Sequence, residues 1–91
     1  MALQEWPSKD PDEVLDYVIN WAARLEEDTI SSSVWTVPAG LTKTDEAFDG
    51  TTTTVWLAAG VLAANYEVHN RIVTSAGRTM DKTVKIKIRA K

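Results

Sequence analysis

Residues 66–89 read YEVHNRIVTSAGRTMDKTVKIKIR, and this stretch decides the fold. In its first part every second residue suits one buried face, which is the period of a strand: Tyr66, Val68, Asn70, Ile72 and Thr74. In its last part three aliphatic residues alternate with three cations: Val84, Ile86 and Ile88 with Lys85, Lys87 and Arg89. The linking segment, residues 75–78, contains a glycine where a tight turn needs a positive φ. The stretch therefore predicts a β-hairpin.

Further strands are expected upstream of this hairpin. Residues 51–57, TTTTVWL, follow a turn signal at Asp49-Gly50 and are almost all β-branched or aromatic. Residues 31–37 are similar around Trp35 and end at Pro38, which cannot donate a hydrogen bond to a sheet. Residues 41–48 carry a weaker signal and predict an irregular edge strand. Several short strands in one small chain favour an antiparallel β-sandwich.

The segment from Asp10 to Asp28 fits two patterns. Asp10, Pro11 and Glu13 have the spacing of a helix start, in which Asp10 caps the helix. The apolar residues that follow fit a helical face, but those from Leu15 to Leu25 also alternate with the period of a strand. The residue pattern alone leaves both interpretations open.

The length of the chain suits one domain, which we expect to span residues 1–91. The chain has four tryptophans and no cysteine, so a core or an interface rich in indoles is expected, without disulfides or thiolate metal sites. No stretch is apolar enough for a membrane helix. The first five residues, Met1 to Glu5, lack the pattern of a secretory signal.

Charge is divided unevenly along the chain. Residues 1–50 hold three Lys/Arg and eleven Asp/Glu, a net charge of −8, whereas residues 51–91 hold seven and two, a net charge of +5. The two halves could pair within one fold or face neighbouring molecules. The cations Lys85, Lys87, Arg89 and Lys91 lie on one face of the last strand, where they could contact nucleic acid. We favour the interpretation that they protect an edge strand from association.

The sequence predicts no catalytic residues, no cofactor and no metal site. The single histidine, His69, lies on the exposed side of its strand and lacks the second ligand that a zinc site needs. The serines at 31–33 have no base at a recognisable spacing. The acidic residues between Asp10 and Asp16 lack the glycine and the distal glutamate of a calcium loop.

Four aromatic residues are expected to have structural roles: Trp21, Trp35, Trp56 and Tyr66. Tyr66 stands where immunoglobulin-like sandwiches carry a tyrosine whose hydroxyl binds upstream backbone, the tyrosine corner. It could equally be an ordinary half-buried aromatic residue. Trp35 could fill the centre of the core.

Several segments together resemble a family of small proteins of tailed bacteriophages, known as fibre–tail adaptors or phage structural proteins. They extend over most of the chain: residues 9–12 (KDPD), Leu15-Asp16-Tyr17 with Trp21, 28–30 (DTI), 35–41 (WTVPAGL), 51–57, and Tyr66 to Thr74 with Gly77-Arg78. The resemblance implies an all-β, immunoglobulin-like fold and favours a strand at Leu15–Trp21. Two segments depart from the family pattern. Residues 25–28 lack an expected glycine, so this turn could be longer or partly helical, and residues 58–64 are unusually apolar.

The resemblance further implies a non-enzymatic virion protein, made in the cytoplasm of the host bacterium, that links the tail to fibre or neck components. Its partners would be other virion proteins in a symmetric, multi-copy assembly. The alternatives are a capsid decoration (cement) protein and, in another class, a small nucleic-acid-binding protein. Candidate interface residues are Val61, Leu62, Lys85, Lys87 and Arg89. Val61 and Leu62 could dock against another subunit or fold under the sandwich as a lid.

Overall fold

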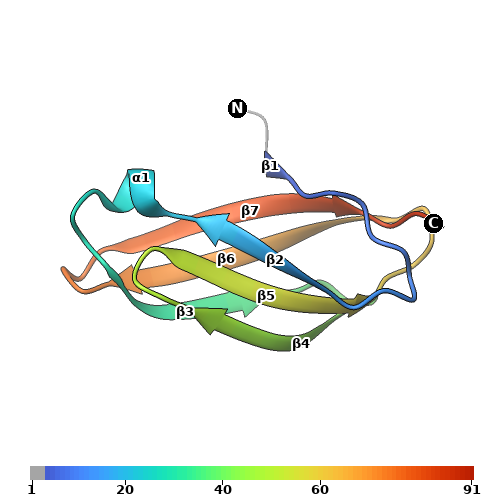
Figure 1. The fold of residues 1–91 in the computed structure, drawn as a ribbon, viewed down its shortest axis with the longest axis horizontal. Coiled ribbons are helices and arrows are strands. Elements are labelled where there is room, and N and C mark those ends of the chain that lie inside the picture. Colours follow the sequence, from blue (N-terminus) through green and yellow to red (C-terminus); the bar gives the residue numbers. More distant parts are fainter. Residues whose placement is uncertain (1–3) are drawn as a thin grey trace.

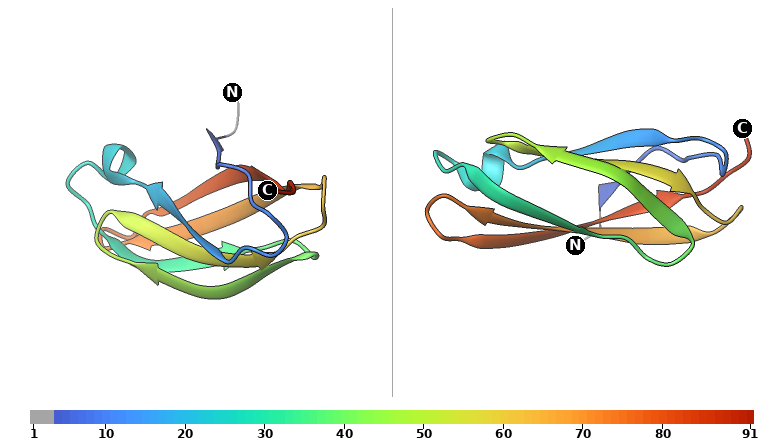
Figure 2. Two further views of the ribbon diagram at one scale, coloured as in Figure 1. Left: turned by 45° about the vertical axis from the view of Figure 1, so that its right-hand side comes forward. Right: turned by 90° about the horizontal axis from the view of Figure 1, so that it is seen from below.

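The computed structural model describes residues 4–91 and consists of two sheets packed face to face (Figure 1). The elements are β1 (Gln4–Glu5), β2 (Leu15–Asn20), α1 (Ala22–Leu25), β3 (Ile30–Thr36), β4 (Leu41–Phe48), β5 (Thr52–Ala59), β6 (Asn65–Thr74) and β7 (Thr79–Lys87). One sheet has the order β1-β7-β6-β3 and the other β2-β5-β4. Figure 2 shows the sheets as two separate layers. The predicted all-β, immunoglobulin-like sandwich is confirmed.

The hairpin of β6 and β7 forms as its alternation predicts. The two strands are antiparallel, with Tyr66 opposite Ile86 and Ile72 opposite Met80. The turn is closed by the Thr74 N–H, which donates to Arg78 O at 2.8 Å, and Gly77 supplies a φ of 87°. The side chains of the inner face are buried because they meet the second sheet.

The ambiguous segment forms a strand over Leu15–Asn20, followed by one helical turn. Tertiary pairing with β5 decides the outcome, because a strand buries both Tyr17 and Ile19 against the other sheet. The residues that resemble a helix start form a compact turn instead. There the Glu13 N–H donates to Asp10 O, and the Asp10 N–H donates to Glu13 Oε1.

The turn at residues 25–28 lacks a glycine and is partly helical at its start. Helix α1 ends at Leu25, and Glu26 then adopts a φ of 59°. Positive φ is uncommon for a residue other than glycine, so Glu26 occupies the conformation that the missing glycine would adopt more easily.

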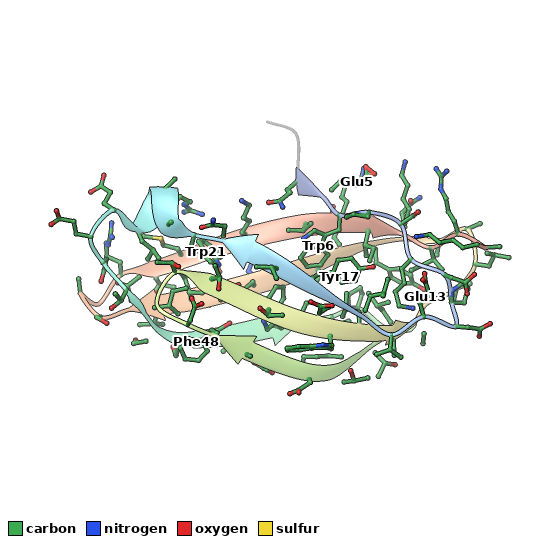
Figure 3. All side chains as sticks on the ribbon, viewed as in Figure 1. Glu5, Trp6, Glu13, Tyr17, Trp21 and Phe48 are labelled. Carbon is green, nitrogen blue, oxygen red and sulfur yellow. The ribbon has the colours of Figure 1, made fainter. Side chains whose placement is uncertain are left out.

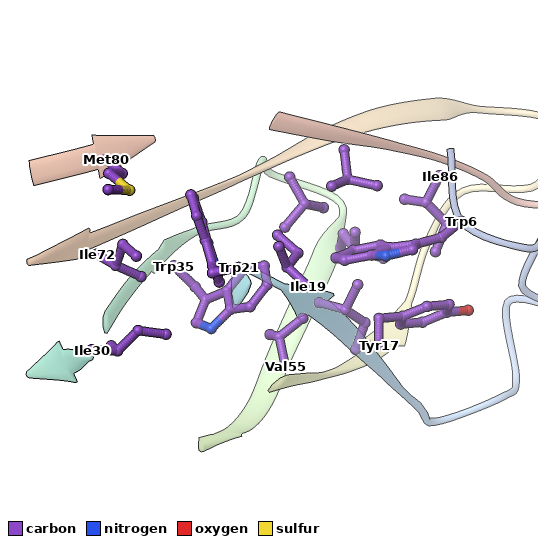
Figure 4. Close-up of a cluster of buried hydrophobic side chains, with 14 of the residues drawn as sticks. Trp6, Tyr17, Ile19, Trp21, Ile30, Trp35, Val55, Ile72, Met80 and Ile86 are labelled. Carbon is purple, nitrogen blue, oxygen red and sulfur yellow. The ribbon is translucent and has the colours of Figure 1, made fainter. Parts of the chain in front are cut away.

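The core lies between the sheets and is rich in aromatic residues (Figure 4). Trp6 stacks on Tyr17 with 4.8 Å between ring centroids, and Trp35 lies 6.1 Å from Trp6. Trp21 is buried near the start of α1. Burial of such large rings supplies much of the apolar contact that a small domain needs.

The interpretation of β7 as a bare edge strand is wrong. The short strand β1 pairs with β7 in parallel, placing Glu5 opposite Lys85, and Lys9 forms an isolated bridge with Ile88. This N-terminal segment carries no apolar alternation that would have predicted its pairing. Within residues 4–91 no helix is long and apolar enough to cross a membrane. Part of the segment considered for a secretory signal, residues 1–3, lies outside the described residues.

Candidate functional site

The loop between β5 and β6, residues 60–64, presents two large aliphatic side chains to solvent. Val61 and Leu62 are 60% and 56% exposed. They therefore do not fold under the sandwich, and the lid interpretation is wrong for the isolated chain. The segment forms a tight turn with positive φ at Ala59, Gly60 and Ala63.

Hydrogen bonds from three backbone N–H groups of the loop connect it to segments next to both sheets. The Gly60 N–H donates to Gly40 O, and the Ala63 N–H donates to Ile88 O. The Val61 N–H donates to the Tyr66 hydroxyl at 3.0 Å. Gly60 has a φ of 106°, and a Cβ there would lie 2.7 Å from Ile88 Cδ1. The two exposed side chains thus project from a fixed backbone, which reduces the entropy cost of binding through them.

A fully buried lysine, Lys9, fastens the base of this loop. Its ammonium group donates to Ala59 O at 2.6 Å and to Asp10 O at 2.8 Å. Desolvation by burial lowers the pKa of Lys9, although the carboxylates of Glu13 and Asp10 oppose that shift. Sequence reasoning missed this role, since nothing in a single lysine before an Asp-Pro turn shows that it is buried.

A shallow hollow of about 280 Å³ lies next to the loop. Its walls are Ala63, Ala64, Asn65, Lys87, Ile88 and Arg89. The Lys87 ammonium is 3.7 Å from a Glu5 carboxylate oxygen, whereas Arg89 forms no ion pair within residues 4–91. The candidate residues Val61, Leu62, Lys87 and Arg89 therefore gather at one end of the sandwich, with an apolar tip beside a basic rim.

Lys85 and Lys91, the other two cations of the predicted basic stripe, lie near acidic residues, two of which belong to the N-terminal half of the chain. Lys85 lies between Glu5 on β1 and Glu67 on β6. The Lys91 ammonium is 3.9 Å from Glu13, which Figure 3 places at one end of the sandwich. These nearby carboxylates reduce the positive potential that binding to nucleic acid would require. They also show that the acidic and basic halves of the chain partly neutralise each other within the fold.

The other residues with potential chemistry have structural partners. His69 lies 3.0 Å from both the Thr83 hydroxyl and Asp81 Oδ1, and Arg71 also binds Asp81. Across residues 4–91 no three His, Cys, Asp or Glu side chains gather closely enough to hold a metal ion.

The four aromatic residues expected to have structural roles divide into three environments. Trp21 and Trp35 lie in the core. Tyr66 is half-buried, and its hydroxyl accepts a hydrogen bond from the backbone N–H of Val61, five residues upstream. Trp56 is half-buried on the outer face of β5, because Val55 and Leu57 take the inward positions.

Comparisons with known proteins identify one family and one fold. The family model described as "Podophage GP4 fiber-tail adaptor protein gp77" matches residues 9–87. A solved structure, the solution structure of the PKD domain from KIAA 1837 protein, superposes with a TM-score of 0.59 at 12% identity, covering 98% of this chain and 81% of that chain. At this identity the likeness shows the fold alone. No curated protein sequence matches the chain.

Proposed function

This chain belongs to the podophage GP4 fiber-tail adaptor family, and we propose that it is a non-enzymatic virion protein that joins the tail to a fibre or neck component. It would be made in the cytoplasm of the host bacterium and assembled in several copies. Other virion proteins would be its partners. The observation that carries this proposal is the rigid, exposed Val61–Leu62 tip beside the basic Arg89.

The physical argument is the cost of leaving this tip exposed. Burying a Val or Leu side chain contributes roughly 1.5–3 kcal/mol, so two exposed neighbours on a fixed backbone favour association. Lys87 and Arg89 line the adjacent hollow. The matching partner is therefore a protein surface with an apolar socket and a carboxylate beside it.

The experiment compares particles assembled with different versions of the chain. Particles that lack the chain are complemented in trans with wild type or with the double variant Val61→Ser, Leu62→Ser. We expect the variant to keep its melting temperature, because both side chains are exposed, and to enter purified particles about tenfold less well or worse.

A matched control is Val34→Ser, which changes another strongly exposed aliphatic residue, 59% exposed on β3 and far from this loop along the chain. It should enter particles like wild type. Equal incorporation of the double variant and wild type would show that the tip is not a docking surface.

A further inference from the structure

The outer face of the β2-β5-β4 sheet carries a tryptophan between two carboxylates. Trp56 lies at the centre of β5, and its direct cross-strand neighbours are Asp16 on β2 and Asp45 on β4. The next row of the same face is Val18, Thr54 and Ala47, and Val18 is 45% exposed. We call these six residues the Trp56 face. A large indole that remains half-buried on an outer face suits a contact with another molecule.

The two carboxylates have no cation of their own. Neither Asp16 nor Asp45 takes part in an ion pair within residues 4–91. The nearest cation along β4, Lys43, is paired with Glu46 and stands opposite Leu57, a residue of the inner face. Two like charges flanking one ring therefore stay uncompensated in the isolated chain.

We propose that the Trp56 face binds an arginine side chain presented by a different virion protein, with the guanidinium over the indole and between the two carboxylates. Tryptophan is the strongest cation–π partner among the side chains, and the planar guanidinium can stack on the ring while its edges donate to carboxylates. The proposal deepens the adaptor function and rests on it, because it assigns the arginine to another protein of the particle.

A second copy of this chain does not fit the Trp56 face. The outer face of the other sheet carries Arg71, Lys85 and Lys87, but each of these cations has a carboxylate beside it. Arg89 has no ion pair within residues 4–91, but it lines the hollow beside Val61 and Leu62, which the proposed function already assigns to another contact. Docking there would exchange existing pairs for new ones and leave carboxylates uncompensated. The loop tip and the Trp56 face also differ in chemistry, one apolar with a basic rim and the other aromatic and acidic. Two such surfaces suit an adaptor that contacts two different proteins.

The first test uses a small probe and needs no particles. The ¹⁵N-labelled chain is titrated with N-acetyl-arginine amide, and with the neutral isostere N-acetyl-citrulline amide at matched ionic strength. We expect the indole N–H signal of Trp56 to shift with arginine and not with citrulline. The buried indoles of Trp6, Trp21 and Trp35 serve as internal controls. Equal shifts with the two probes, or no shift with either, would overturn the proposal.

The second test uses the isosteric double variant Asp16→Asn, Asp45→Asn, which keeps the shape of the face and its fold. We expect it to lose the arginine-induced shift and to enter particles roughly tenfold less well. Glu67→Gln, on the outer face of the other sheet, is the matched control and should behave like wild type. Normal incorporation of the double variant would overturn the proposal.

The outcomes separate this inference from the adaptor function. If wild type itself never enters particles, the adaptor function fails, and with it the assignment of the arginine to a virion protein. If only the Val61→Ser, Leu62→Ser variant is excluded, the adaptor function stands and the Trp56 face does not. Self-association of wild type in light scattering that Trp56→Thr abolishes would identify a second copy as the occupant and overturn the choice of a different protein.

Discussion

A series of buried side-chain hydrogen bonds joins the two sheets, and Thr53 is its central residue. The Trp21 indole N–H donates to the Thr53 hydroxyl at 3.1 Å, and that hydroxyl donates to Asn70 Oδ1 at 2.7 Å. The Asn70 amide then donates to Ser33 Oγ and Val34 O. Thr53 belongs to one sheet and Asn70 to the other, so the substitution Thr53→Val cuts the connection between the sheets without creating a cavity.

The loss of stability expected for Thr53→Val follows from the two buried groups that lose their hydrogen-bond partner. Valine has the shape of threonine, but it leaves the Trp21 indole N–H and the Asn70 carbonyl without a hydrogen bond. An unsatisfied buried group costs about 1–3 kcal/mol. With some return from the added methyl group, we expect a loss of about 2–4 kcal/mol in the free energy of unfolding. For a domain of this size that lowers the melting temperature by roughly 10–25 °C.

The assay is urea unfolding followed by tryptophan fluorescence and repeated by circular dichroism. Thr54→Val is the matched control, because Thr54 is the next residue of β5 and faces outward. We expect its free energy of unfolding to stay within about 0.5 kcal/mol of wild type. If Thr53→Val proves as stable as Thr54→Val, the hydrogen bonds of Thr53 contribute nothing to the free energy of unfolding and the reasoning is refuted.

Two further predictions concern Tyr66 and Asp28. Tyr66→Phe removes the acceptor of the Val61 N–H and should cost about 0.5–1 kcal/mol in the free energy of unfolding, measured in denaturant melts. Tyr17→Phe should cost nothing, because the Tyr17 hydroxyl finds no hydrogen-bond partner within residues 4–91, and equal losses for the two variants would contradict this reasoning. A hydrogen bond from the Thr74 hydroxyl, with other donors, lowers the pKa of Asp28 from 3.8 to about 2. Ionised Asp28 therefore stabilises the fold fully above pH 3.8, and this contribution is lost as the pH falls toward 2. In melts at several pH values, the difference in free energy of unfolding between wild type and Asp28→Asn should shrink over that interval. A difference that stays constant would show that the pKa of Asp28 is normal.

The sequence determined those elements whose signal is local. The alternation around Val68 and Val84 is enough to specify a hairpin, because one residue of slip would move every apolar side chain to the wrong face. The same alternation placed Asn70 on the inward face, where it is buried, but its hydrogen-bond partners came only from the structure. The sequence also placed Val61 and Leu62 in a loop, but it left open whether their side chains were exposed or covered, and only the structure shows them exposed.

Only the tertiary structure decided the features that depend on residues distant in sequence. Whether Leu15–Asn20 became strand or helix depended on the free edge of β5, and the burial of Lys9 depended on the carbonyl of Ala59. The pairing of Asp16 and Asp45 with Trp56 depended on the register of three strands. Periodicity reports which faces of a segment are apolar, but the partner that covers or flanks a face is set by long-range packing, which no local pattern encodes.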